Sequence, residues 1–378
     1  MMEPDTIHYF PPHISSIEEF KQIAKVYDKY LTMVWKDLDQ IRANQHFDEM
    51  DETECAWWES VLQIKITGEE SLEDRRRNIK GIWCPADADS DDRRSGRHGT
   101  YEQEEKEIFM DSELLYVFGT GNATVTNLYN TCFALRDGDE YFMVDAGGGN
   151  GILKILDNMQ VPLEHIHHIF VTHAHTDHVL GIVWMVRMIA TKMKKDQYVG
   201  DAYIYCHSEL IETIRTLCRL TIQDKFYNMI GNRIHLEEVK DGETRHILSY
   251  DVTFFDIHST KLKQFGFTLT LNNGRKLTCA GDEPYNPVCE KYVRGSDWLL
   301  HEAFCLYAER DIWKPYEKHH STVKDACELA ESLGIPNLVL WHTEDSNVAG
   351  RERLYKSEGK RYYSGNIYVP DDESLIAL

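Results

Sequence analysis

Long apolar runs and paired cysteines are both missing from this sequence of 378 residues. No apolar run approaches the roughly 20 residues that a membrane-spanning helix needs, so we expect no membrane segment. The first residues carry acidic side chains and lack the basic-then-apolar pattern of a secretory signal. The nine cysteines are scattered without CxxC spacing, which favours reduced, buried thiols and a cytoplasmic protein.

Positive charge is also scarce. The chain has 41 lysines and arginines against 63 acidic residues, which gives a formal net charge of −22. A protein that binds a long polyanion usually presents positive potential over its surface, so we expect no long nucleic-acid partner. Apolar residues make up 42% of the chain, which is ample for a packed core.

The first 83 residues have the pattern of a small all-helical domain. Ser16 and Glu19 form a capping-box start, and apolar residues then recur at three-to-four spacing as far as Ile41. Further helices are expected to open near Asp51 and Ser71. Three stretches, residues 9–12, 58–62 and 71–76, resemble the N-terminal part of a family of phage tail or baseplate proteins. The alternative is a helical cap or oligomerisation element that docks a protein partner.

A change of composition separates this region from the rest of the chain. Residues 84–110 are polar, charged and nearly free of large apolar side chains, which predicts a flexible linker. Residues 111–378 form the third predicted segment, in which strand patterns alternate with helical ones. The expected strands are 114–118, 128–136, 141–144, 166–172, 202–206, 251–256, 265–271, 276–280, 298–300, 338–340 and 362–369. The expected helices are 152–159, a stretch from 208, and 322–333.

Four potential metal ligands follow the expected strand at 166–172. They are His173, His175, Asp177 and His178. Alternation along an extended backbone sends the first two imidazoles to the same side. Several imidazole nitrogens and a carboxylate in one small volume suit one or two borderline divalent ions. The alternative is a histidine-rich strand end that holds no metal.

The order His-x-His-x-Asp-His resembles the metal-binding signature of the metallo-β-lactamase superfamily. Six further segments resemble its ribonuclease Z-like phosphodiesterase branch and occur in that family's order: residues 142–148, 255–259, 280–284, 300–304, 320–322 and 340–343. The resemblance implies an α/β fold, a four-layer αββα sandwich, over residues 111–378. It also implies a hydrolase whose site lies at the mouth between the two sheets.

The resemblance further implies a complete ligand set for two divalent ions. His173, His175 and His258 would hold one ion, Asp177, His178 and His342 would hold the other, and Asp282 would bridge them. Taken alone, His258, Asp282 and His342 would be ordinary polar loop residues. Zinc is the first expectation for an imidazole-rich site, with manganese or iron as alternatives. Asp145 is expected to be structural.

Three residues are implied to be catalytic. Asp177 would orient or deprotonate a water molecule while it binds metal. His320, steadied by the carboxylate of Glu302, would be the general acid that protonates the leaving oxygen. Phe304 stands where the family often has threonine. Read without the family, His320 would be a neighbour of a helix N-cap, and His319 competes with it for the catalytic role.

One departure from the family bears on the substrate. Ribonuclease Z enzymes that mature tRNA carry a long basic arm between the residues that match His258 and Asp282, which here are only 24 positions apart. We therefore expect a small phosphodiester substrate, such as a cyclic nucleotide or a short nucleotide. The alternatives are a lactone or thioester hydrolase, a tRNA 3′-processing endonuclease, and a tail-associated binding or structural protein. A homodimer is a further expectation.

Overall fold

The computed structural model describes residues 113–378. The helical domain predicted at 1–83 and the linker predicted at 84–110 lie outside the described residues. Both therefore stay predictions. No helix within the described range has the length and apolar character that a bilayer crossing requires.

The first half of the described chain builds one seven-stranded sheet and the helices beside it. The strand order is β14-β1-β2-β3-β4-β5-β6. Its elements, in chain order, are β1 (Leu114–Gly119), β2 (Cys132–Asp137), β3 (Glu140–Val144), α6 (Gly151–Asn158), β4 (His168–Phe170), α7 (Thr176–Met193), β5 (Ala202–Cys206), α8 (Ser208–Thr221), α9 (Asp224–Tyr227) and β6 (Ile234–Glu238).

The second half builds another seven-stranded sheet, in the order β13-β12-β11-β10-β9-β8-β7. Its last strand, β14, belongs to the first sheet. Its elements are β7 (Thr244–Ile247), β8 (Tyr250–Asp256), β9 (Phe265–Thr270), β10 (Lys276–Cys279), α10 (Glu290–Val293), β11 (Trp298–Glu302), α11 (Arg310–Trp313), α12 (Val323–Leu333), β12 (Asn337–Trp341), α13 (Val348–Gly359), β13 (Asn366–Tyr368) and β14 (Ser374–Ala377). Short 3-10 turns lie at Leu163–His165, Pro287–Cys289, Tyr307–Glu309 and Tyr316–Lys318.

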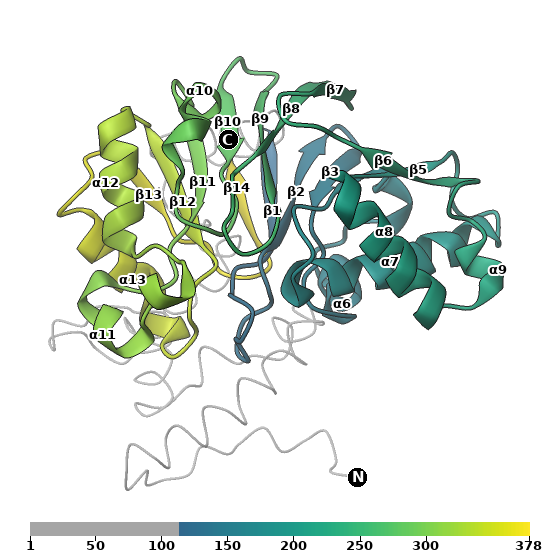
Figure 1. Ribbon diagram of the computed structural model, residues 1–378, viewed down its shortest axis with the longest axis horizontal. Helices are drawn as coiled ribbons and strands as arrows, with labels where there is room; N and C mark the ends of the chain where they lie inside the picture. The colour runs from purple at the N-terminus through teal and green to yellow at the C-terminus, as the bar shows by residue number, and fades with distance from the viewer. Residues whose placement is uncertain (1–112) are drawn as a thin grey trace, which may run out of the picture. The chain divides into compact units, whose positions relative to one another are not determined.

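Three apolar clusters show that these elements form four layers. One cluster joins the first sheet to α6, α7 and α8, and another joins the second sheet to α12 and its neighbours. The third lies between the sheets, where Phe133 stacks on Trp341 with ring centroids 4.7 Å apart. Figure 1 shows the two helical layers on opposite sides of the paired sheets. The predicted four-layer αββα sandwich is therefore confirmed for the described residues.

Local sequence signals account for several of these boundaries. Thr322 and Asp325 form a reciprocal capping box at the start of α12, and Gly334 ends the helix in a left-handed conformation. Strands β9 and β10 pair as an antiparallel hairpin across the turn that contains Gly274. This hairpin and the loop before it fill the interval between His258 and Asp282.

Several predicted boundaries were wrong, mainly where strands are short or lie at sheet edges. The strand predicted at 128–136 begins only at Cys132, that at 166–172 is limited to His168–Phe170, and that at 362–369 to Asn366–Tyr368. Strands β6, β7 and β14 were missed because they are edge strands, whose half-exposed residues lack a regular apolar alternation. Helix α13 was missed because it has almost no amphipathic pattern.

Candidate metal centre and catalytic pair

The predicted ligands come from the ends of strands in both sheets. His173 and His175 follow β4, and Asp177 and His178 occupy the first turn of α7. Asp282 follows β10. His342 directly follows β12 in a left-handed backbone conformation. The parallel strands therefore deliver these side chains to one edge, where loops of open α/β sheets carry functional groups.

The structure brings six of the seven predicted ligands into two overlapping groups. Asp177, His178, Asp282 and His342 form one group, and His173, His175 and Asp282 form the other, with the potential ligand atoms of each group within 4.8 Å of one another. The shared residue is Asp282, whose Oδ2 lies 3.4 Å from His173 Nε2, 3.4 Å from His178 Nε2 and 3.6 Å from His342 Nε2. Asp282 is thus common to both groups, and its role as a bridging ligand stays a prediction.

Asp145 fixes the orientation of two of these imidazoles. Its Oδ2 lies 2.7 Å from His178 Nδ1 and accepts a hydrogen bond from Thr172 Oγ1 at 2.7 Å. Thr172 Oγ1 in turn lies 2.9 Å from His173 Nδ1, so its lone pair can accept the proton of that nitrogen. Both imidazoles then carry their proton on Nδ1 and present Nε2 to the site. Partners of this kind behind metal-binding histidines fix the tautomer and ring orientation.

The other two imidazoles are also directed inward. Thr131 Oγ1 lies 3.3 Å from His342 Nδ1, which leaves Nε2 facing Asp282. His175 instead presents Nδ1, 2.8 Å from His173 Nε2. Within residues 113–378, the buried Nε2 of His178 has no hydrogen-bond partner, although it lies 3.3 Å from Asp177 Oδ2. A buried ring nitrogen that faces carboxylates in this way lies where a divalent ion could bind in place of its proton.

The electrostatics of the site favour the protonation states that a metal needs. Burial lowers the pKa of His342 to about 4 and holds that of His173 well below its usual range, so both imidazoles are neutral. Burial opposes ionisation of Asp177 and Asp282, but the surrounding histidines outweigh it and lower the pKa of both carboxyls.

His178 is the exception among the predicted ligands. Burial lowers its pKa, but the neighbouring Asp177 and Asp145 outweigh that effect and raise the pKa well above the ordinary value. A proton on Nε2 of this imidazole occupies the position that a cation would take. Metal binding at His178 is therefore expected to displace a proton.

His258 is the one predicted ligand that lies outside both groups. Its side chain is exposed, and its backbone is left-handed, with a φ of 59°. The loop around it nevertheless adjoins the centre, because Ser259 Oγ donates a 2.8 Å hydrogen bond to Glu283, the neighbour of Asp282. The role of His258 as a ligand stays a prediction.

His320 and Glu302 lie together beside the metal groups. Glu302, at the end of β11, is fully buried, and its Oε2 lies 2.7 Å from His320 Nδ1. Its Oε1 accepts a 2.6 Å hydrogen bond from the backbone N–H of Ser321. The His320 ring stacks on Phe304, with centroids 4.9 Å apart, and lies 5.4 Å from the ring of His342. His320, rather than His319, therefore forms the predicted pair with Glu302.

Gln264 belongs to the centre but was not predicted from the sequence. It precedes β9, is 1% exposed, and donates from Nε2 to Asp282 Oδ1. The same nitrogen lies 3.2 Å from His173 Nδ1. A glutamine one position before a strand has no distinctive spacing, so the sequence contains no signal that would have identified it.

Known proteins resemble this chain in sequence and in fold. A sequence model of the family described as Anti-Pycsar protein Apyc1 matches residues 114–351. A second family model, Bacteriophage Mu-like Gp48, matches residues 4–81, the region for which a likeness to phage proteins was expected. A ribonuclease Z from Thermococcus sibiricus is 24% identical over 311 residues, which cover 69% of this chain and 94% of that protein.

Two solved structures share the fold. A metallo-β-lactamase fold protein from Bacillus subtilis has a TM-score of 0.58 at 17% identity, covering 70% of this chain and 99% of that one. The Zn²⁺-bound PqqB from Methylobacterium extorquens has a TM-score of 0.55 at 13% identity, covering 70% of this chain and 100% of that one.

Fold, site and relatives together define a metal-dependent hydrolase of the metallo-β-lactamase superfamily, in its ribonuclease Z-like branch. The expected superfamily and branch are thus confirmed. Because one family model covers more than half of the sequence, the chain belongs to the Anti-Pycsar protein Apyc1 family.

Proposed function

We propose that this protein hydrolyses a small phosphodiester, such as a cyclic nucleotide or a short nucleotide. It would use two divalent ions, for which zinc is the first expectation. The main support is the pair of His320 and Glu302, with 2.7 Å between Nδ1 and Oε2, beside the predicted ligand His342. A thioester hydrolase would leave this buried pair without a function, because a thiolate can leave without a proton. A phosphodiester does need it, because its leaving alkoxide requires a proton.

Metal binding, orientation of water and proton donation are assigned to different side chains of the site. His173, His175, Asp177, His178, Asp282 and His342 would hold the ions, and His258 would complete the set. When bound, two such ions activate water and stabilise charge on a phosphoryl group. Asp177, ionised at neutral pH because its pKa is lowered, orients the attacking water molecule and accepts its proton. His320 donates from Nε2 to the leaving oxygen.

The Glu302–His320 pair is suited to proton donation in either arrangement of its shared proton. Burial raises the pKa of Glu302 and lowers that of His320 to about 4, which favours a proton on the carboxyl of Glu302. Whether that proton lies on the carboxyl or on Nδ1, Nε2 keeps its own proton. Once Nε2 has given that proton up, the shared proton lies on Nδ1 in either case, so the imidazole ends neutral and Glu302 ends as the anion.

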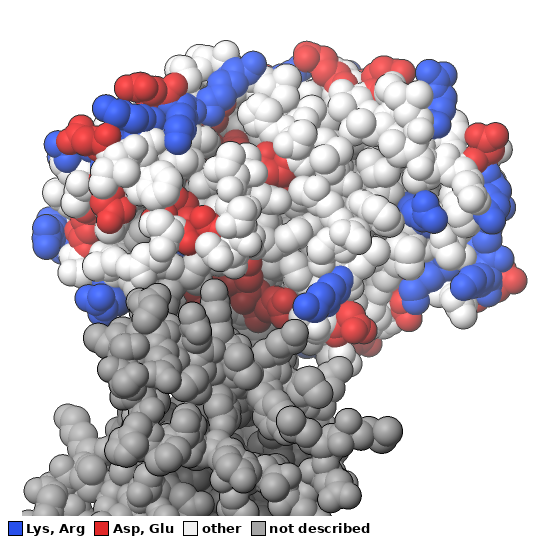
Figure 2. Space-filling view, turned by 90° about the horizontal axis from the view of Figure 1, so that it is seen from below, with Lys and Arg blue, Asp and Glu red and all other residues white. Residues whose placement is uncertain are grey.

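The loop and hairpin that separate His258 from Asp282 favour a small substrate. This interval contains β9, β10 and their turn, without space for a protruding arm. The formal net charge of −22 also disfavours a long nucleic acid. On the face shown in Figure 2, basic and acidic side chains are interspersed over the described residues that are visible. The family is named for an anti-Pycsar protein, and we propose the same role for this chain.

The test is a substrate screen with the metal-loaded full-length protein. The panel contains 3′,5′-cyclic mononucleotides, linear dinucleotides, a precursor tRNA, a lactone and a thioester. We expect turnover of one or more of the small phosphodiesters, and its loss in His320→Ala. Preferential cleavage of the precursor tRNA would favour the endonuclease instead. Turnover of the lactone or thioester that survives in His320→Ala would contradict the phosphodiesterase.

A further inference from the structure

Gln264 makes a polar contact inside the metal centre that neither the motifs nor the relatives assign. Its side chain is 1% exposed, and its Nε2 donates to Oδ1 of Asp282. The opposite oxygen of that carboxylate, Oδ2, is the one that faces His173, His178 and His342. The two oxygens of Asp282 are therefore divided between an amide on one side and three imidazoles on the other.

The backbone around Gln264 holds this amide in place. The carbonyl oxygen of Gln264 accepts a 3.1 Å hydrogen bond from the N–H of Ile257, which closes the loop between the two residues. The next residue, Phe265, donates from its N–H to Thr172 O at 3.1 Å, which ties the start of β9 to the chain just before His173. Gln264 and Asp282 also line one cavity together, beside His178 and Thr131.

Gln264 Nε2 lies near two polar atoms, His173 Nδ1 and Asp282 Oδ1, and only Asp282 can accept its proton. Its Nε2 lies 3.2 Å from His173 Nδ1, but an amide nitrogen is only a donor. The proton on His173 Nδ1 goes instead to Thr172 Oγ1 at 2.9 Å. The amide of Gln264 is thus left to donate to Asp282, and its Oε1 has no hydrogen-bond partner among the described residues.

We propose that Gln264 is a positioning residue that fixes the carboxylate of Asp282, so that Oδ2 points at both metal positions. A neutral donor is needed here. An apolar side chain would leave a buried carboxylate oxygen unpartnered, and a second carboxylate would repel the first. Residues that support metal ligands from behind typically change metal affinity by about 10–100-fold when they are replaced.

The proposal rests on the metal centre in the proposed function, and its test does not depend on the substrate. Gln264→Met and Gln264→Leu keep the volume of the side chain but remove the donor. Zn²⁺ affinity is measured on the full-length protein by competition with a chromophoric chelator. We expect the Zn²⁺ affinity of one or both metal sites to fall about 10–100-fold. A wild-type protein that binds zinc but hydrolyses nothing would contradict the proposed function alone.

Ser296→Ala is the matched control. Ser296 is also buried, at 2% exposed, and its Oγ lies 2.7 Å from Thr278 Oγ1 on β10, away from the metal ligands. We expect this variant to keep wild-type zinc affinity. The midpoint of thermal unfolding of each metal-free variant separates a loss of fold from a loss of ligand geometry. Wild-type zinc affinity in both Gln264 variants would overturn the proposal, as would failure of both to fold while Ser296→Ala folds normally.

Discussion

His320 Nδ1 lies 2.7 Å from Oε2 of Glu302, a carboxylate that is fully buried at the end of β11. The second oxygen of Glu302 is held by the backbone N–H of Ser321, so the carboxylate cannot turn without breaking a buried hydrogen bond. Phe304, in the position where the family often has threonine, covers the imidazole as a stacked ring. The pair is therefore fixed before a substrate arrives.

Glu302→Gln tests this relationship. The amide keeps the shape of the side chain but cannot carry the shared proton. We expect kcat on the preferred phosphodiester to fall by about 10²-fold or more, with zinc content unchanged. His320→Ala should lose a similar amount, and the double variant little more than either alone, because the two residues act as a unit. Strictly multiplicative losses would show that the residues act independently.

Gly181 on α7 packs directly against the turn that carries Asp145. A Cβ on Gly181 would lie 1.9 Å from the carbonyl oxygen of Ala146, and the N–H of Gly181 donates to Gly147 O at 2.8 Å. Gly181→Ala must therefore push α7 away from this turn. We expect a loss of about 1–3 kcal/mol in the free energy of unfolding, measured by urea denaturation, and weaker zinc binding.

Gly149→Ala is the control for that substitution. A Cβ on Gly149 would meet no atom of the described chain within 4 Å, although the residue lies in the same turn. We expect its stability and zinc affinity to stay close to those of the wild type. Equal stability of the two alanine variants would show that the contact between α7 and the turn is not tight.

His168 on β4 provides a pH test outside the metal centre. Burial lowers the pKa of this imidazole to about 4, and the ring stacks on Tyr203 with Nδ1 3.0 Å from Tyr205 Oη. Its pKa in the unfolded chain is about 6.5, so between these values the unfolded state binds more protons. The contribution of His168 to the free energy of unfolding should therefore fall as the pH is lowered through this window, and level off below it.

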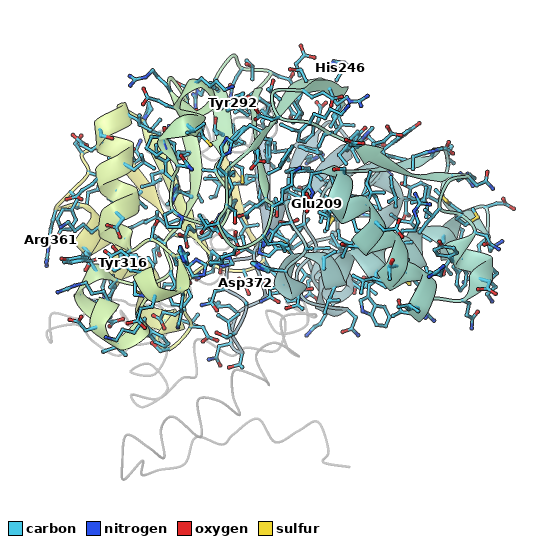
Figure 3. The ribbon with its side chains drawn as sticks, in the orientation of Figure 1. Glu209, His246, Tyr292, Tyr316, Arg361 and Asp372 are labelled. Atoms are coloured by element: carbon cyan, nitrogen blue, oxygen red, sulfur yellow. The ribbon has the colours of Figure 1, made fainter. Side chains whose placement is uncertain are left out.

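The measurement is urea unfolding at about pH 7 and about pH 5, with a chelator present so that metal binding does not contribute. His168→Phe keeps an aromatic ring in the stack and removes the titrating group, so it should lose less stability between the two pH values than the wild type. His246, exposed on β7 (Figure 3), is the control position, and His246→Phe should behave as the wild type does. An unchanged pH dependence in His168→Phe would show that this imidazole is not held neutral.

Much of the metal centre could be predicted from the sequence because its ligands stand in motifs. His173, His175, Asp177 and His178 lie so close in the chain that their grouping follows from local geometry. Asp282 and His342 could be placed only through the family resemblance, because spacing cannot relate residues more than a hundred positions apart. His258 was assigned in the same way, and the structure leaves it exposed beside the centre.

Other features depend on tertiary contacts that have no local signal. Gln264 reaches Asp282 because β9 and β10 are paired, and nothing around it in the sequence marks it as buried. The edge strands β6, β7 and β14 are defined by their neighbours in the sheet, and their own apolar pattern is weak. Asp372 (Figure 3) likewise accepts hydrogen bonds from Thr120 and Tyr129, which lie 252 and 243 positions earlier in the chain.

The proposed reaction and the proposed role of Gln264 both require a pair of divalent ions held by side chains from both sheets. Elemental analysis of the full-length protein, purified without chelators and titrated with Zn²⁺, measures this pair. We expect two equivalents of transition metal per chain in the wild type and a reduced content in His342→Ala. A wild-type protein that retains no transition metal after titration would show that the predicted metal centre does not exist.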